Sequence, residues 1–215
     1  MREVISDELK KLLSLPLPGR EAQWLMAPLN RRAREVEALR TEGARESAVL
    51  LLINPFTEIP SFFLIERQGY DGPHSGQIGL PGGKKEATDA DFWHTAIRET
   101  TEELGISADS IEPLGMLTEL FIPVSRFWVF PKIGILKNEV ALSPDAREVK
   151  RVIAPFIGEV LKEENRARRS VSAGGFQLEA PVFIFNDIQV WGATAMILSE
   201  FSEVLKQSDL IRYYS

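Results

Sequence analysis

Hydrophobic and polar residues follow two different periods along this chain, one typical of strands and one typical of helices. The continuous apolar run 47–54 predicts a buried strand, and a turn at 55–60 leads into 61–66, its expected hairpin partner. Four further strands are expected over 111–120, 127–136, 149–155 and 181–186. Strands are therefore expected along most of the chain after residue 46.

Segments with helical periodicity lie between and around these strands. Apolar residues three and four positions apart predict helices over 3–15, 91–104, 157–163 and 190–207. For the second helix, Thr88 is the expected N-cap because Asp91 follows it at capping-box spacing, and Gly105 is the expected end. The basic stretch 166–175, which contains Gly and Ser, is expected to be a loop.

This order of elements indicates a fold class. Strands that interleave with helices are typical of the α/β class with a mixed β-sheet. A length of 215 residues suits one large domain with an appendage. We expect residues 1–45 to form an N-terminal helical extension, solvated where charges are dense, and residues 46–215 to form the main domain.

The charge balance argues against some partners. The chain has 25 Lys and Arg against 31 Asp and Glu, a net charge of −6, so neither nucleic acid nor a membrane surface is an expected partner. No apolar run approaches the roughly 18 residues of a membrane span. The N-terminal residues 1–4 lack the features of a signal peptide, so we expect a cytoplasmic protein.

The residue types that bind metal ions are also restricted. The chain has no cysteine and two histidines, His74 and His94, which excludes disulfides, Cys-based zinc sites and thiol nucleophiles. Any metal ion must therefore be held by carboxylates and backbone oxygens, and this favours Mg²⁺ or Mn²⁺.

An acidic cluster lies near the end of the predicted helix 91–104. Glu99 precedes Glu102 and Glu103 by three and four residues, so the three carboxylates share one helix face and repel one another. A divalent cation would remove that repulsion, and the pair Gly82 and Gly83 can bring a backbone carbonyl to the same ion, because glycine permits close approach. The ordinary alternative is a solvated acidic helix face, which these residues alone do not exclude.

The acidic cluster belongs to a longer pattern that resembles the signature of Nudix hydrolases. The matching residues, in order, are Gly83, Arg98, Glu99, Glu102, Glu103, Gly105 and Ile106. The interval from Gly83 to Arg98 is one residue longer than the general signature, Asp89 replaces an upstream Glu, and Thr100 stands at a usually apolar position. The longer interval and Asp89 resemble the coenzyme A pyrophosphatase-like subgroup, as do 64–67, 74–83 and 190–195.

The resemblance covers about residues 47–205 and implies a Nudix-type α/β/α sandwich that hydrolyses a diphosphate. It implies Mg²⁺ or Mn²⁺ as cofactor, held by Glu99, Glu102, Glu103 and the carbonyl of Gly83, with Arg98 orienting the glutamates. Glu99 or a carboxylate from a later loop would act as general base. The expected substrate contacts are Arg67, His74, Gln77 and Lys84. A surface role is equally compatible with Lys84, and His74 in a Gly-rich loop can instead satisfy backbone groups.

The resemblance leaves the substrate open. Coenzyme A or an acyl derivative is expected from the subgroup, but Gly72 stands where the subgroup carries an Arg that can bind phosphate. A different nucleoside diphosphate derivative is one alternative, and a nucleotide-binding sensor without turnover is another. Cleavage of any diphosphate would exclude the sensor. A homodimer is expected from the family only.

Overall fold

The computed structural model describes residues 1–28, 43–69, 76–123, 125–173 and 176–208. Its α-helices are α1 (Arg2–Leu13), α2 (Gly19–Trp24), α4 (Phe92–Leu104) and α5 (Gly192–Leu205). Three short 3₁₀ helices are η2 (Ala108–Ser110), η3 (Ile157–Leu161) and η4 (Glu163–Asn165). The strands are β1 (Arg45–Asn54), β2 (Ser61–Phe62), β3 (Leu64–Arg67), β4 (Ile78–Gly79), β5 (Gly82–Lys84), β6 (Ile111–Met116), β7 (Leu120–Ile122), β8 (Phe127–Leu136), β9 (Val149–Ile153), β10 (Arg166–Ala173), β11 (Phe176–Phe185) and β12 (Ile188–Trp191).

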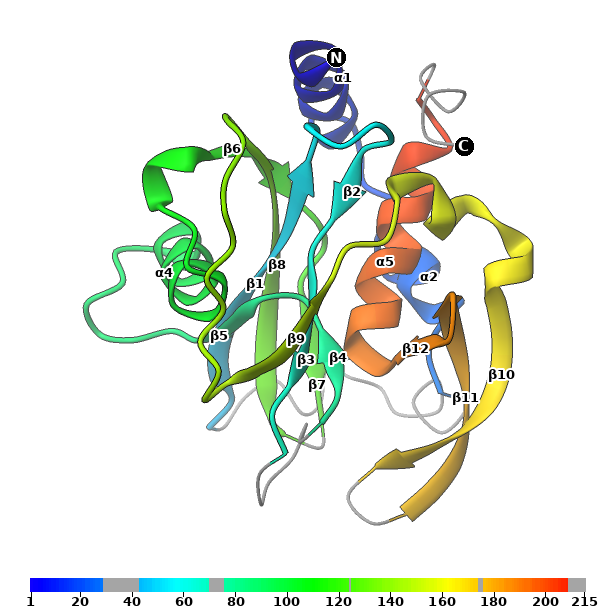
Figure 1. Ribbon diagram of the computed structural model, residues 1–215. Helices are drawn as coiled ribbons and strands as arrows, with labels where there is room; N and C mark the ends of the chain where they lie inside the picture. Colours follow the sequence, from blue (N-terminus) through cyan, green and yellow to red (C-terminus); the bar gives the residue numbers. More distant parts are fainter. Residues whose placement is uncertain (29–42, 70–75, 124, 174–175, 209–215) are drawn as a thin grey trace.

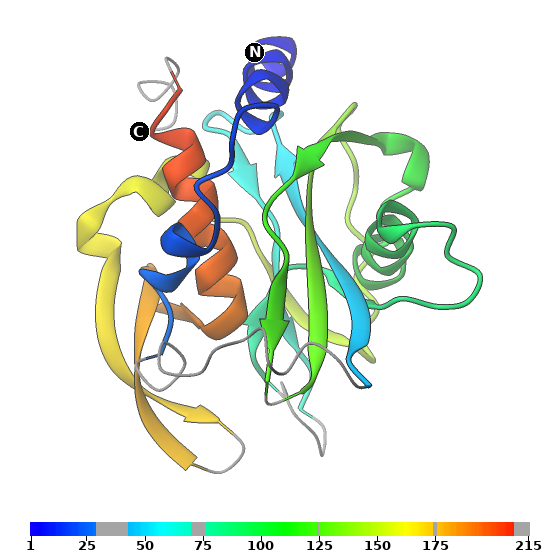
Figure 2. The same ribbon diagram turned by 180° about the vertical axis from the view of Figure 1, so that it is seen from behind.

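A six-stranded mixed sheet forms the centre of the molecule. Its order is β2-β1-β8-β6, with β5 paired to β1 and β7 paired to β8. The β1 and β8 strands run parallel, whereas the other pairs in this sheet are antiparallel. Helix α4 lies on one side of the sheet, and α5 with α2 lies on the other (Figures 1 and 2). The expected α/β/α sandwich with a mixed sheet is confirmed.

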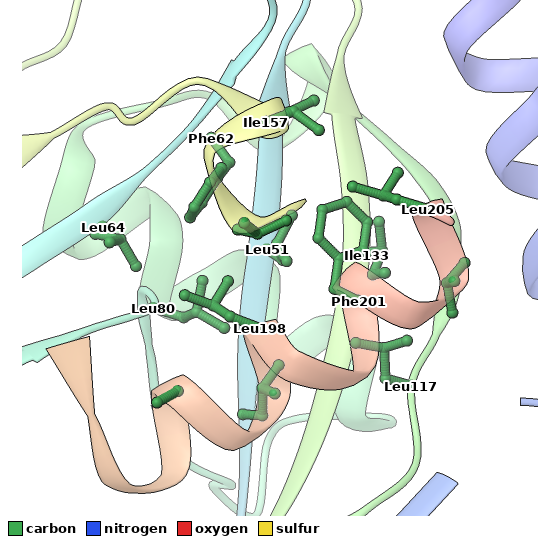
Figure 3. Packing of buried hydrophobic residues seen from close by; sticks show 14 of the residues in the cluster. Leu51, Phe62, Leu64, Leu80, Leu117, Ile133, Ile157, Leu198, Phe201 and Leu205 are labelled. Carbon is green, nitrogen blue, oxygen red and sulfur yellow. The ribbon is translucent and has the colours of Figure 1, made fainter. Parts of the chain in front are cut away.

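The apolar run of β1 supplies the core on both faces of the sheet. Leu51 and Ile53 belong to the large cluster that includes α5, whereas Leu50 and Leu52 belong to the cluster that includes α4. Successive side chains of a strand point to opposite faces, so a strand covered on both sides needs apolar residues throughout. Figure 3 shows Leu198, Phe201 and Leu205 of α5 packed over Leu51 and Ile133.

The expected hairpin between 47–54 and 61–66 forms only at its tip. The register joins Ile53 to Phe62 and Asn54 to Ser61, after which the chain leaves for a second sheet of order β4-β3-β9. The long neighbour of β1 is instead β8, over nine residue pairs. Sequence adjacency thus predicted the partner of the end of β1 correctly, but β5 takes another part of that edge and β8 pairs along the opposite edge.

The prediction of a loop over 166–175 is wrong, since β10 occupies most of this stretch and pairs with β11 over eight residue pairs. Strands β10, β11 and β12 form a third sheet beside α5 (Figure 1). Arg168, Arg169 and Ser170 are exposed, whereas Val171 is buried against Ala180 and Val182. A strand with one solvated side carries many polar residues, and the basic composition concealed it.

Several element boundaries also differ from the expectations. The predicted helix 157–163 consists of 3₁₀ turns, and the predicted strand 111–120 is divided into β6 and β7. The last helix begins at Gly192, after the strand that ends at Trp191. The N-cap of α4 is Asp91, whose carboxylate accepts the His94 N–H, and not Thr88. The helices expected over 3–15 and 91–104 are confirmed with small changes at their ends.

The N-terminal helices pack on the same core as the rest of the chain. Ile5, Leu9 and Leu12 of α1 and Met26 after α2 belong to the cluster that includes α5. The predicted domain boundary at residues 45 and 46 stays a prediction, and the charged stretch around 31–42 lies outside the described residues. Within the described ranges, no helix is long and apolar enough to cross a membrane.

Candidate active site

Helix α4 holds the acidic cluster against the glycine strand β5. The Asp91 carboxylate caps its first turn, and Gly105 ends it in the left-handed conformation with φ of 69°. Ala96 and Leu104 anchor the helix in the core beneath the sheet. The opposite ends of the helix are thus fixed by local sequence, and its apolar stripe fixes which face turns inward.

Glu103 is the most deeply placed of the three glutamates. It is only 1% exposed and accepts hydrogen bonds from Arg67 Nη1 and from the Gly82 N–H, both at 2.8 Å. Arg67 also donates from Nη2 to the Gly82 carbonyl at 2.8 Å. Burial raises the pKa of Glu103 to about 7, although the Arg67 guanidinium acts in the opposite direction.

Glu99 lies directly over Gly83. A Cβ atom at residue 83 would meet the Glu99 carboxylate at 2.5 Å, so only glycine leaves room for the carboxylate there. Burial raises the pKa of Glu99, and the neighbouring Arg98 partly offsets this effect. Glu102, the third glutamate, faces solvent with about half of its side chain exposed.

Arg98 connects the acidic residues of the site. Its guanidinium donates to both oxygens of Asp89, pairs with Glu99 and Glu102 at 3.0 Å, and donates to the Lys84 carbonyl. Asp89 is buried, and its hydrogen bonds to Arg98 hold its pKa well below the usual range. The hydrogen bonds to Asp89, and the nearby charge of Glu99, raise the pKa of Arg98. Arg98 therefore orients Glu99 and Glu102 from an anchor at Asp89.

The expected substrate contacts are distributed unevenly. Arg67 lies at the site, but both of its terminal nitrogens bind protein oxygens. Lys84 is exposed at the end of β5, beside the arginine that binds its carbonyl. The Gln77 carbonyl accepts the Arg67 N–H at 3.1 Å, next to the site. His74 and Gly72 lie outside the described residues.

The donor atoms of the site suit a hard divalent cation. The three glutamates offer carboxylate oxygens, which are the ligands that such ions prefer. Because Gly83 has no side chain, the backbone of β5 also lies close to the Glu99 carboxylate. In the described parts of the chain, no three His, Asp or Glu side chains are grouped as metal ligands. In this structure the three carboxylates pair with arginines, Glu103 with Arg67 and both Glu99 and Glu102 with Arg98.

Comparison with known proteins identifies this arrangement. The sequence pattern of the NUDIX domain matches residues 43–156, which contain β1, β5 and the whole of α4. The chain belongs to the Nudix family. The family match and the similarity to named Nudix hydrolases show that the protein is a Nudix-type diphosphate hydrolase. Hydrolases of this class generally use divalent metal ions and act on small nucleotide-derived substrates.

The similarity to individual Nudix proteins covers more of the chain than the NUDIX domain match does. The human mitochondrial coenzyme A diphosphatase NUDT8 is 32% identical over 73% of this chain and 67% of its own length. The uncharacterized Nudix hydrolase NudL of Yersinia enterocolitica is 27% identical over 75% of this chain and 82% of its own length. Among solved structures, the MutT protein of Methanosarcina mazei shares the fold with a TM-score of 0.50, 16% identity, and coverage of 76% of this chain and 96% of that one.

Two residues take a larger part in the site than the sequence reasoning gave them. Gly82, considered with Gly83 as a source of a backbone carbonyl, donates its N–H to Glu103 and accepts from Arg67 at its carbonyl. Asp89 was noted as a replacement but not as the anchor of Arg98. Its spacing of nine residues from Arg98 crosses from a loop to a helix, so periodicity gives no signal for the contact.

Proposed function

We propose that the protein hydrolyses the diphosphate of coenzyme A or acyl-coenzyme A, giving 3′,5′-ADP and 4′-phosphopantetheine or its acyl form. The observation that carries the proposal is the 32% identity with a relative named as a coenzyme A diphosphatase, over a region that includes α4 and β5. The subgroup-like motifs at 64–67, 74–83 and 190–195 add support from outside the Nudix signature.

The proposed cofactor is Mg²⁺ or Mn²⁺, with Glu99, Glu102, Glu103 and the carbonyl of Gly83 as ligands. When bound, such an ion neutralises phosphate charge and lowers the pKa of coordinated water. Arg98, held by Asp89, orients Glu99 and Glu102, and Arg67 orients Glu103. Gln77, Lys84 and His74 are proposed contacts for the substrate, with Arg67 joining them if it releases Glu103.

A panel of diphosphates tests the substrate. Purified protein with Mg²⁺ or Mn²⁺ is given coenzyme A, its 3′-dephospho form, ADP-ribose, a dinucleotide and NADH, and the products are resolved by mass. We expect coenzyme A to give 3′,5′-ADP, which is diagnostic because the 3′-phosphate stays on the nucleotide. Preference for a substrate without that phosphate would instead favour another nucleoside diphosphate derivative, the reading that Gly72 motivates.

A further inference from the structure

Strand β3 carries Arg67 into the site through an irregular pairing with β9. The register joins Glu66 to Arg151 but Arg67 to Val149, so Lys150 is an extra residue on β9, a β-bulge. Val149 is buried in the cluster beneath α4, on the same side as Arg67. Without the extra residue, Lys150 would oppose Arg67 in place of Val149.

A single carboxylate binds both residues at the bulge. Lys150 Nζ lies 2.6 Å from Glu66 Oε1, and Arg151 Nε donates to Glu66 Oε2. Consecutive residues of a regular strand point to opposite faces, and here the bulge lets both side chains reach one carboxylate. The Glu66 side chain is 12% exposed, whereas Lys150 and Arg151 are 60% and 51% exposed and lie over it. The ion triad and the bulge therefore occur at the same three residues.

We propose that Glu66 is a positioning residue, which locks the β3–β9 bulge through Lys150 and Arg151 and thereby keeps Val149 packed beside Arg67 on the α4 side. A slip of one residue moves the side chains of β9 to the opposite face, so the bulge decides whether buried Val149 or charged Lys150 stands beside the arginine that binds Glu103. The segment beyond the bulge is held on both sides, because the Arg67 N–H donates to the Gln77 carbonyl and the Gln68 N–H to the Glu148 carbonyl.

The inference rests on the proposed role of Glu103, and its first test is a matched pair of variants. Glu66→Gln removes the charge that binds Lys150 and Arg151. Glu112→Gln is the control, because Glu112 also pairs with two cations, Arg2 and Lys10, beside a register irregularity of β6 and away from α4. With coenzyme A and Mg²⁺ we expect kcat of Glu66→Gln to fall about tenfold with a smaller change in KM, because misplacement of reacting groups slows the chemical step.

A second pair of variants, at exposed Lys150, distinguishes a loss of positioning from a folding defect of Glu66→Gln. Lys150 is exposed, so Lys150→Met should fold normally and lower kcat in the same direction, and Lys150→Arg should restore most of the activity by keeping the charge. Wild-type kcat in Glu66→Gln, or an equal loss in Glu112→Gln, would overturn the proposal.

Amide hydrogen exchange tests the proposal without turnover. We expect the Gln68 amide to exchange about tenfold faster in Glu66→Gln, because its acceptor, the Glu148 carbonyl, follows directly on the bulge, and the adjacent Arg67 amide to be accelerated with it. Glu112→Gln should affect neither amide. If the wild-type protein does not cleave coenzyme A but this acceleration is seen, the proposed substrate fails and the positioning role stands. Unchanged exchange at both amides would contradict the positioning role whatever the substrate.

Discussion

At the scale of single residues, two adjacent glycines allow strand β5 to approach both the sheet and the acidic helix. Gly82 has a φ of 146°, and a Cβ there would lie 2.3 Å from the Ala48 carbonyl oxygen. At Gly83 the obstacle is different, because the nearest atoms belong to the flexible end of the Glu99 side chain. Gly82 is therefore needed for the fold, and Gly83 is needed for the position of a carboxylate.

Gly83→Ala separates these two requirements. The new methyl group displaces the Glu99 carboxylate, while the backbone of residue 83 tolerates alanine, so we expect turnover to fall about 100-fold with little change in melting temperature. Turnover and thermal unfolding are measured on the same preparation. Gly69→Ala is the matched control, since nothing lies within 4 Å of its added Cβ. Equal activity of the two variants would contradict the role given to the Glu99 position.

Glu103→Gln tests the deepest carboxylate of the site. The amide keeps one acceptor oxygen, for either the Gly82 N–H or Arg67, and loses the charge that a divalent ion needs, so we expect metal-dependent turnover to fall at least about 100-fold. The protein should still fold, with a lower melting temperature because one buried donor loses its acceptor. Glu86→Gln, an exposed change in the preceding loop, is the control. Normal turnover by Glu103→Gln would exclude it as a metal ligand.

Asp89 should make the stability of the folded protein depend on pH. Its folded pKa is lowered chiefly by Arg98, so the stabilisation is present above the unfolded pKa of about 4 and is lost as the pH falls below it. Urea unfolding should therefore show Asp89→Asn less stable than the wild type at pH 7, with the difference shrinking towards pH 3. In an Arg98→Met background the difference at pH 7 should be small. A difference that grows on acidification would refute the Asp89–Arg98 assignment.

At the scale of elements, helix α4 is defined by its two ends. Both Thr88 and Asp91 are residues that cap helices, and the chain geometry selects Asp91, whose carboxylate receives the His94 N–H at 2.9 Å. Asp89, between the two, is turned inward to Arg98 and Thr95. The start of the helix is thus coupled to the site, because the same short segment provides the cap and the anchor of Arg98.

Alanine substitutions distinguish the two capping residues. We expect Asp91→Ala to lower the free energy of unfolding by about 1 kcal/mol, because the first turn loses its acceptor. Thr88→Ala should change it by less than about 0.5 kcal/mol, since Thr88 is exposed and the structure gives it no capping bond. Chemical denaturation of both variants measures the difference. A larger effect at Thr88 would show that Thr88, as the sequence pattern predicts, is the N-cap.

At the scale of the whole molecule, a buried carboxylate joins the N-terminal segment to the rest of the fold. Glu200 of α5 is fully buried and accepts from the Gly19 N–H, from Gln23 Nε2, and from the Thr118 N–H and hydroxyl. These donors come from α2 and from the segment between β6 and β7, and all are uncharged. Helix α2, which precedes the NUDIX match, is therefore held by hydrogen bonds to Glu200 as well as by apolar packing.

Removing this carboxylate should loosen the N-terminal segment. Glu200→Ala leaves several buried donors without an acceptor, so we expect the protein to lose about 3 kcal/mol of stability and limited proteolysis to cleave earlier near α2. Glu203→Ala, on the same helix and paired only with Lys206, is the control and should cost much less. Similar stability of the two variants would show that apolar packing alone holds the segment.

The sequence alone determined those features whose causes are local. The 3.6-residue period and Gly105 defined α4, and the spacing of Glu99, Glu102 and Glu103 placed them on one turn of it. The continuous apolar run predicted that β1 is covered on both faces, as the alternation of Leu50 and Leu51 between two clusters confirms. Membership of the Nudix family was also contained in these short-range patterns.

Only the tertiary structure decided which distant residues meet. No local period reveals β8 as the long parallel neighbour of β1, shows β10 in a basic stretch, or places an extra residue at Lys150. The partners of Arg67 and Arg98 likewise lie far along the chain or across a loop. These choices depend on burial and register summed over the whole molecule, because a strand gains its stability from whichever neighbours cover it.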